Sequence, residues 1–160
     1  MKYGFIGFGN LAKAIWTGLK EDKDIEFAYV DKINNEKEIK SFENISLLVS
    51  FSDVIWLCIK PQNLVEVLEE LKNINLDGKI LVSPVAGKSI KFIQDSLGKN
   101  VNIVRIMPNL AIAYGKSVTA YCVNKGNNIF AEKIKNDLSK LGKVIELPEE
   151  KFDLFTAIFG

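Results

Sequence analysis

The sequence predicts an α/β domain built on a doubly wound, mostly parallel β-sheet with helices on both faces. Short apolar runs of strand length alternate along the chain with segments whose apolar residues recur at helical spacing. Several of these runs are continuous rather than alternating, which is typical of parallel strands buried on both faces. The predicted strands cover residues 3–6, 25–30, 54–59, 79–83, 101–107, 115–122 with its opening turn, and 144–147. The predicted helices cover residues 11–19, 44–51, 63–71, 89–97, 129–141 and 151–160.

Local signals justify the elements of the first half. Strand 3–6 meets a glycine-rich turn, and the helix that follows has one apolar face. Asn44 or Ser46 is a suitable N-cap for helix 44–51. The run 54–59 contains no charged residue and stops at Lys60-Pro61, because proline cannot continue a central strand.

The second half repeats the alternation. Strand 79–83 leads into a turn, after which Ser89 opens a helix and Gly98 ends it. Strand 101–107 ends in Pro108-Asn109. The remaining segments continue the alternation of strand-like and helix-like runs. The last segment, residues 151–160, begins an apolar helical pattern.

The bulk composition excludes several classes of protein. The 160 residues suit one domain, with 48% hydrophobic and 26% charged residues. The net charge of +1, from 21 basic and 20 acidic residues, favours neither a nucleic acid nor an anionic membrane as partner. The N-terminus does not read as a signal peptide, and Cys58 and Cys122 read as buried thiols in a reducing compartment. We therefore expect a cytoplasmic protein.

The chain contains no histidine. This excludes a Ser-His-Asp or Cys-His nucleophile system within the chain, and it removes the commonest zinc ligand. No metal site is expected. Chemistry would have to come from a cofactor or from Lys, Tyr, Cys or carboxylate side chains.

Gly7-x-Gly9-x-x-Ala12 fits the dinucleotide-binding fingerprint of a Rossmann-type fold. Gly7 permits the tight turn out of the strand, Gly9 lets a pyrophosphate approach the backbone, and Ala12 lets the helix pack close to the sheet. The free N–H groups and the positive dipole end of that helix would face the phosphates. The preceding strand and the following helix provide the context that the motif requires.

The end of the second strand carries two residues with opposite implications. Asp31 lies 22 residues after Gly9, where an acidic residue can accept hydrogen bonds from a ribose diol and favour NAD. Lys32 can pair with a 2′-phosphate and favour NADP, unless it is only a solvated loop charge. The choice between NADPH and NADH stays open at this stage.

The predicted topology brings the breaks of several strands together. Gly7, Asp31, Lys60-Pro61, residues 85–87 and Pro108-Asn109 each follow the carboxyl end of a strand. In open α/β sheets, ligands bind beyond the carboxyl ends of the strands. We therefore expect these segments to gather along one edge of the sheet.

Five segments resemble one enzyme family, in the same order along the chain. They are Gly4-Phe-Ile-Gly-Phe-Gly-Asn-Leu-Ala-Lys-Ala-Ile15, Ser52-Asp-Val-Ile-Trp-Leu-Cys-Ile-Lys-Pro61, Ser83-Pro-Val-Ala-Gly87, Val104-Arg-Ile-Met-Pro-Asn109 and Phe155-Thr-Ala-Ile-Phe-Gly160. Together they are similar to segments of the pyrroline-5-carboxylate reductases. The resemblance implies an oxidoreductase that reduces the C=N bond of 1-pyrroline-5-carboxylate to L-proline with NADPH or NADH, in proline biosynthesis.

The resemblance, together with the fingerprint, assigns candidate site residues. Cofactor binding is expected at Gly7, Phe8, Gly9, Asn10, Leu11, Ala12, Asp31, Lys32, Asn44, Cys58, Ile59, Lys60, Pro61, Val85, Ala86 and Gly87. The backbone of residues 8–12 would hold the pyrophosphate, Asn44 would contact the adenosine side, and residues 58–61 and 85–87 would line the cofactor toward the nicotinamide. Asn109 is the candidate nearest to nicotinamide and substrate, and no catalytic residue is assigned.

The resemblance also bears on domain organisation. It implies a cofactor-binding domain over residues 1–148 and, over residues 149–160, the start of a linker helix into a helical dimerisation domain that this chain does not include. As such a fragment the chain would bind cofactor but turn over substrate weakly, and the whole enzyme would be a homo-oligomer acting on a cyclic imino acid. The alternatives are another NAD(P)-dependent reductase or dehydrogenase of the same Rossmann group, or a non-catalytic NAD(P)-binding module.

Overall fold

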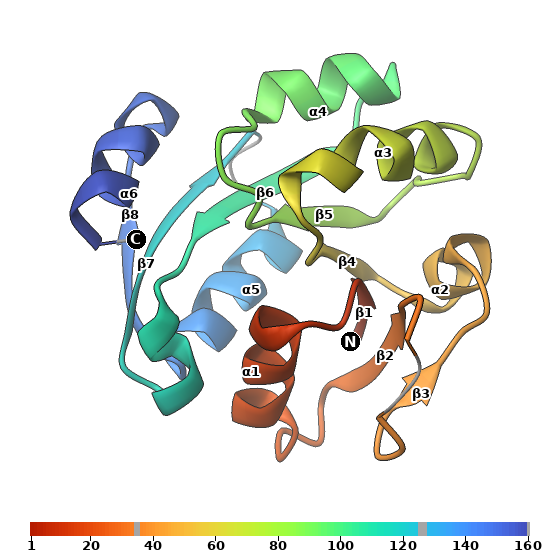
Figure 1. The fold of residues 1–160 in the computed structure, drawn as a ribbon, viewed down its shortest axis with the longest axis horizontal. Helices are drawn as coiled ribbons and strands as arrows, with labels where there is room; N and C mark the ends of the chain where they lie inside the picture. The colour runs from red at the N-terminus through yellow and green to blue at the C-terminus, as the bar shows by residue number, and fades with distance from the viewer. Residues whose placement is uncertain (34–35, 125–127, 160) are drawn as a thin grey trace.

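A single twisted sheet organises the molecule (Figure 1). The computed structural model describes residues 1–33, 36–124 and 128–159. Within these residues, eight strands pair in the order β3-β2-β1-β4-β5-β6-β7-β8. The strands are β1 (Lys2–Ile6), β2 (Glu26–Val30), β3 (Lys40–Ser41), β4 (Val54–Leu57), β5 (Ile80–Ser83), β6 (Asn102–Met107), β7 (Ser117–Val123) and β8 (Gly142–Glu146). Neighbouring strands are parallel except β6 and β7, which are antiparallel.

Helices cover both faces of this sheet. The α-helices are α1 (Asn10–Leu19), α2 (Ile45–Phe51), α3 (Leu64–Lys72), α4 (Ile90–Leu97), α5 (Ile129–Ser139) and α6 (Phe152–Phe159). In Figure 1, α2, α3 and α4 cover one face of the sheet, and α1 and α5 cover the other face. The predicted doubly wound, mostly parallel α/β architecture is confirmed.

Alternation along the strands divides the core into two layers. In β1, Tyr3 and Phe5 pack with the apolar faces of α1 and α5, whereas Ile6 packs with α2, α3 and α4. In β4, Trp56 belongs to the first layer and Leu57 to the second. Successive strand residues point to opposite faces, so a continuous apolar run fills both layers at once.

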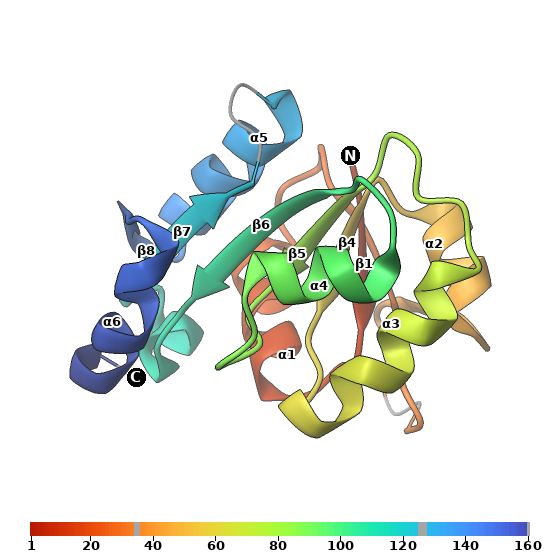
Figure 2. The same ribbon diagram turned by 90° about the horizontal axis from the view of Figure 1, so that it is seen from above.

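The last third of the chain extends the sheet on one side. Figure 2 shows β7, β8 and α6 beyond β6, away from the part of the sheet that β1 to β5 form. Because β7 runs antiparallel to β6, its carboxyl end lies at the opposite edge from that of β6. The ligand-binding edge of a parallel sheet therefore ends at β6.

Some boundaries differ from the sequence prediction. The run 54–59 leaves the sheet at Leu57, so Cys58 and Ile59 lie in the loop after β4. They are apolar because the loop packs against the β1–α1 turn, where the Cys58 carbonyl lies close to Gly7. The short strand β3 and a 3₁₀ helix over Leu110–Tyr114 were not predicted.

The predicted caps are present. The Asn44 side chain accepts a hydrogen bond from Leu47 N–H at 2.9 Å, and Ser89 accepts one from Phe92 N–H at 3.0 Å. Gly98 ends α4 in the left-handed conformation. Gly160, the last residue of the predicted terminal helix, lies outside the described residues. Among the helices described, none is long and apolar enough to cross a bilayer.

Candidate functional site

The strand ends gather as the sequence predicts. Strands β2, β1, β4, β5 and β6 are consecutive neighbours and all run parallel. The segments that follow them are Asp31, Gly7, Lys60-Pro61, residues 85–87 and Pro108-Asn109, in that order across the sheet. One edge of the sheet therefore carries all five predicted breaks.

Gly7 is required by the fold itself. Its φ is +83°, and a Cβ built on it would lie 2.3 Å from the Cys58 carbonyl oxygen. Its N–H donates to the Val30 carbonyl at 2.9 Å. The turn is thus held tightly between the ends of β2 and β4, and a side chain cannot be accommodated there.

Gly9 has different surroundings, and the fold does not require glycine at this position. Gly9 is the N-cap of α1 with φ −84°, and a Cβ built on it would meet no atom within 4 Å. The first helical hydrogen bond runs from Lys13 N–H to the Gly9 carbonyl, so the N–H groups of residues 10–12 lie outside the helical ladder. The cap residue provides no side-chain hydrogen bond, and the first turn holds no acidic residue. This open, positively polarised helix end suits an anionic group.

Asp31 fixes the glycine-rich turn. Its Oδ2 accepts a hydrogen bond from Phe8 N–H at 2.6 Å. The Phe8 ring is buried and stacks on Tyr29, with 4.4 Å between ring centroids. Phe8 N–H is therefore engaged within the protein, and the N–H groups of residues 10–12 remain for a ligand. The sequence spacing placed Asp31 near the turn but did not reveal this bond.

A cavity of about 370 Å³ opens on one side of Asp31. Its apolar lining includes Ile45, Ile59 and Val67. Of the predicted site residues, Gly7, Lys32 and Asn44 also line it. The side-chain oxygen of Asn44, Oδ1, caps α2, and the side-chain amide nitrogen of the same residue can still act as a donor.

Sequence reasoning missed several polar residues of this cavity. Glu43, Asn63, Glu66 and Glu70 line it beside Asp31. Glu66 and Glu70 are one helical turn apart on α3, a spacing that places both on one face. That spacing was visible in the sequence, but the orientation of α3 toward the end of β2 depends on tertiary packing.

A smaller cavity of about 250 Å³ lies on the other side of the glycine-rich turn. Phe8, Gly9, Lys13 and Asp31 contribute to its lining. Asp31 therefore separates the two cavities and borders both. A ligand that crosses the α1 N-terminus would pass this carboxylate.

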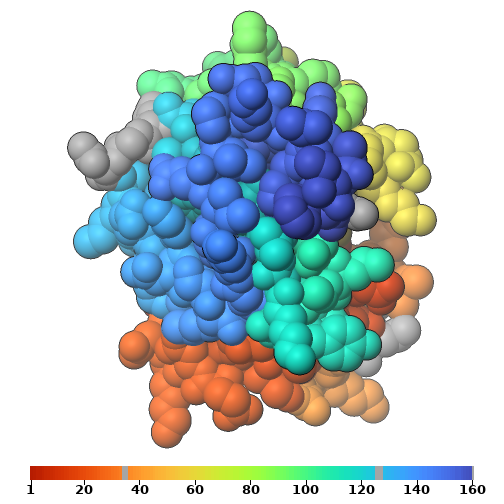
Figure 3. Space-filling view, turned by 90° about the vertical axis from the view of Figure 1, so that its left-hand side faces the viewer, coloured from red at the N-terminus to blue at the C-terminus, as the bar shows by residue number. Residues whose placement is uncertain are grey.

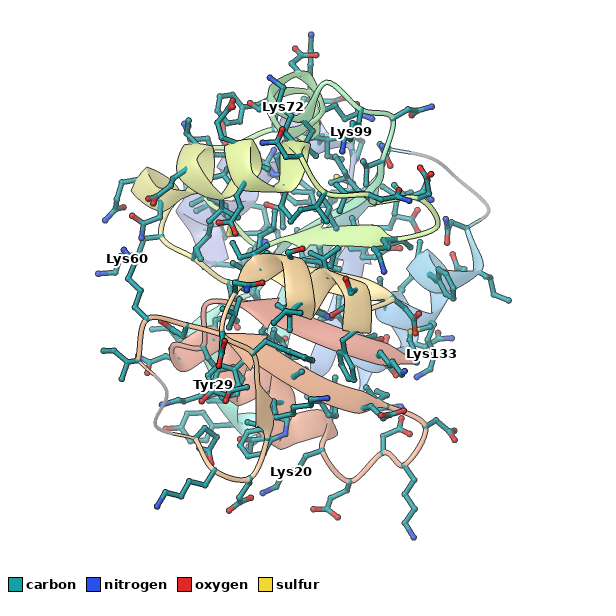
Figure 4. All side chains as sticks on the ribbon, turned by 90° about the vertical axis from the view of Figure 1, so that its right-hand side faces the viewer. Lys20, Tyr29, Lys60, Lys72, Lys99 and Lys133 are labelled. Carbon is teal, nitrogen blue, oxygen red and sulfur yellow. The ribbon has the colours of Figure 1, made fainter. Side chains whose placement is uncertain are left out.

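The other predicted residues in the loops after β4 and β5 do not belong to the lining of the larger cavity. Cys58 follows β4 directly, and burial raises the pKa of its thiol, so the thiol stays neutral. Pro61 opens a 3₁₀ turn, and Lys60 extends outward from the surface (Figure 4). Val85 is buried, whereas Ala86 and Gly87 are exposed in the loop after β5.

Asn109 lies at the far end of the edge. It is partly exposed, and its side-chain oxygen accepts a hydrogen bond from Val118 N–H at 3.3 Å. This bond orients the amide, and it leaves the amide nitrogen as the group that can donate to a ligand. The order of residues across the sheet therefore places Asp31 at one end of the edge and Asn109 at the other.

Comparison with known proteins identifies the family. Residues 2–87, more than half of the chain, match the family described as NADP oxidoreductase, coenzyme F420-dependent. The chain belongs to this family. The matched segment runs from the start of β1 through the loop after β5, so it includes every predicted site residue except Asn109.

Similarity to individual proteins extends over the whole chain. The chain is 31% identical to a pyrroline-5-carboxylate reductase of Aquifex aeolicus and 33% identical to one of Staphylococcus epidermidis, with all of this chain covered in both alignments. It spans 62% and 64% of the length of these two relatives. The resemblance that the sequence motifs indicated is thereby confirmed.

Solved structures agree with this result. The fold superposes on the Plasmodium falciparum pyrroline carboxylate reductase with NADP bound at a TM-score of 0.90 and 27% identity, over 100% of this chain and 62% of the other. A 1-pyrroline-5-carboxylate reductase from Streptococcus pyogenes gives a TM-score of 0.88 at 27% identity, over 100% and 63% of the two chains.

Proposed function

We propose that this chain binds a nicotinamide adenine dinucleotide along the carboxyl edge of its sheet, and that the protein reduces 1-pyrroline-5-carboxylate to L-proline with it. The observation that carries the proposal is the open N-terminus of α1 at the centre of that edge, where Gly9 leaves free space. The relatives named pyrroline-5-carboxylate reductase, together with the NADP-bound neighbour, support the choice of reaction.

The dinucleotide would lie across the edge from β2 to β6. Its pyrophosphate would accept hydrogen bonds from the N–H groups of residues 10–12, stabilised by the dipole of α1. The adenosine would occupy the cavity of about 370 Å³, with its base against Ile45, Ile59 and Val67 and its ribose beside Asp31. Lys32 and Asn44 are the further polar groups that we place on the adenosine side.

The nicotinamide would lie toward β5 and β6. The bound cofactor supplies the hydride, and the protein supplies position and electrostatics. Residues 58–61 and 85–87 would line the ring, and the neutral Cys58 thiol would add no competing nucleophile. We place the Asn109 amide nitrogen where the nicotinamide and the cyclic imine meet, as a hydrogen-bond donor that orients one of them.

The boundaries of the domain are also a proposal. We assign residues 1–148 to the cofactor-binding domain and residues 149–160 to a connecting helix. On α6, Leu154 and Ile158 are 59% and 64% exposed, and Figure 3 shows this helix on the same face as residues 110–114. We propose that this apolar face packs against further protein in a homo-oligomer that acts in the cytoplasm.

Titration with reduced cofactor tests the binding step. We expect NADH or NADPH to bind with an increase in nicotinamide fluorescence and with quenching of tryptophan fluorescence. If neither cofactor binds at millimolar concentration, the proposal is overturned. ADP-ribose should compete, because it carries the adenosine and pyrophosphate groups without the nicotinamide.

A substrate comparison tests the reaction. The assay follows cofactor oxidation with 1-pyrroline-5-carboxylate, with 2-keto acids and, in the reverse direction, with 3-hydroxy acids. We expect turnover with the cyclic imine and formation of proline. Turnover of a keto or hydroxy acid without turnover of the imine would instead identify another dehydrogenase of the same fold.

A further inference from the structure

The two residues at the end of β2 have unequal settings. The Asp31 carboxylate is held by the hydrogen bond of 2.6 Å from Phe8 N–H and is only partly exposed. Lys32 is exposed in the bend that follows the strand. A fixed acceptor loses little freedom when it binds a ligand, whereas an exposed lysine must give up several rotatable bonds.

The wall of the larger cavity is predominantly acidic. Asp31 and the exposed residues Glu43, Glu66 and Glu70 line it, and Lys32 is the one basic residue among the described residues of the lining. The carboxylates come from three elements: the end of β2, the residue before the N-cap of α2, and α3. Lys60, on the neighbouring loop, extends outward from the surface (Figure 4) and does not belong to the lining.

The carboxylates of this wall would interact differently with NADP and with NAD. The 2′-phosphate of NADP carries close to two negative charges near neutral pH, and all its oxygens are acceptors. An ionised carboxylate is also only an acceptor, so it repels the phosphate and cannot hydrogen-bond to it. The 2′-hydroxyl of NAD is a donor and matches the Asp31 oxygens.

We infer that this site prefers NADH to NADPH, and that Glu66 and Glu70 are specificity-determining residues that oppose the 2′-phosphate. The inference rests on the proposed function, since it concerns the same cofactor site.

Titration of the chain with both reduced cofactors tests the preference. We expect the Kd for NADPH to exceed that for NADH by on the order of tenfold at low salt, because like charges are brought together in the NADPH complex. Added salt should narrow the ratio, since screening weakens charge repulsion at solvent-accessible sites. A Kd for NADPH equal to or below that for NADH overturns the inference and leaves the proposed function standing.

Charge-neutral variants test the role of α3. In Glu66→Gln/Glu70→Gln we expect the Kd for NADPH to fall several-fold more than the Kd for NADH, so that the NADPH-to-NADH ratio of Kd values falls. Glu69→Gln is the matched control, because Glu69 lies on the same helix, is exposed, and is not part of the cavity lining. It should leave the NADPH-to-NADH ratio of Kd values as in the wild type.

The outcomes separate the two proposals. Glu69→Gln removes one charge and the double variant removes two. If Glu69→Gln changes the logarithm of the ratio by half as much as the double variant does, or more, net charge rather than the cavity wall is responsible, and the role of Glu66 and Glu70 is overturned. If neither cofactor binds the wild-type chain, the proposed function and this inference fail together. Thermal unfolding of each variant confirms that the fold is retained.

Discussion

At the scale of single residues, the two glycines of the β1–α1 turn serve different purposes. Gly7 is needed by the backbone, since its φ is +83° and an added Cβ would collide with the Cys58 carbonyl. Gly9 has ordinary dihedral angles and open space around its Cα. The fold itself therefore does not require glycine at position 9, whereas the proposed pyrophosphate site would.

Adding the same methyl group at each position should have opposite effects. We expect Gly7→Ala to lower the free energy of unfolding by about 1–3 kcal/mol or more, because of its strained φ and the collision. We expect Gly9→Ala to unfold at the wild-type temperature but to weaken NADH binding by about tenfold or more, because a Cβ would occupy the approach to the α1 N-terminus.

Thermal unfolding and cofactor titration of both variants check this prediction, and each variant is the control for the other. A Gly9→Ala variant that binds NADH as tightly as the wild type would contradict the placement of the pyrophosphate. The sequence motif includes both glycines, but only the three-dimensional structure shows that the fold needs Gly7 and leaves open space at Gly9.

At the scale of elements, hydrogen bonds of the Glu149 carboxylate connect the start of α6 to the sheet. Glu149, just before α6, accepts hydrogen bonds from Arg105 Nη1 at 2.8 Å and from Ile90 N–H at 2.7 Å. Arg105 is 4% exposed, and its guanidinium lies 4.8 Å from the centre of the Phe152 ring. The contact joins β6, the start of α4 and the start of α6.

Removing this carboxylate should release α6. We expect Glu149→Ala to cost about 3 kcal/mol, the lower end for a broken buried pair, because Arg105 loses its partner while Glu149 itself keeps some contact with solvent. Amide exchange should accelerate first in α6. Glu150→Ala is the matched control, since Glu150 is the neighbouring exposed residue, and its loss should change neither stability nor exchange.

Several elements could be predicted because their signals are local. Strand β4 is a continuous apolar run, and the caps Asn44 and Ser89 precede helices with one apolar face. The two residues of β3 are too few to form a pattern. The antiparallel direction of β7 depends on which strand it meets, and that choice is not encoded within 117–123 itself.

At the scale of the whole molecule, the site was predictable in outline and not in detail. Topology alone places the breaks after β2, β1, β4, β5 and β6 on one edge. The Asp31–Phe8 hydrogen bond and the carboxylates of α3 arise from packing between segments far apart in the sequence. Cofactor preference depends on those details, which is why the residues Asp31 and Lys32 alone left it open.

A buried polar contact joins the first strand, β1, to α5 in the last third of the chain. The Tyr3 hydroxyl on β1 donates to the Asp137 carboxylate on α5, and both residues are fully buried. Lys133 and Lys140 also donate to Asp137, at 2.7 and 3.0 Å. Figure 4 shows Lys133 at the rim of the molecule, on the opposite side from Lys60. The contact connects the β7–α5–β8 unit to β1.

The free energy of unfolding at high pH should depend on the Tyr3–Asp137 hydrogen bond. Burial, and then the hydrogen bond to Asp137, raise the pKa of the Tyr3 hydroxyl. Above about pH 10 the unfolded chain releases this proton whereas the folded protein keeps it, so the free energy of unfolding falls as the pH rises. Burial also raises the pKa of Tyr121, which adds to the same loss.

We therefore expect Tyr3→Phe to lower stability at pH 7 by about 1.5–3 kcal/mol, because a hydrogen bond to a buried carboxylate is lost. Its stability should then decline less steeply above pH 10 than that of the wild type, with the remaining slope due to Tyr121 and other groups. Tyr114→Phe removes the same hydroxyl from a side chain that is 81% exposed, so both quantities should match the wild type. Urea unfolding from pH 7 to pH 11 measures them. An unchanged alkaline slope in Tyr3→Phe would show that this hydroxyl ionises equally in the folded and unfolded states, and it would contradict the hydrogen bond from Tyr3 to Asp137 as a connection between β1 and α5.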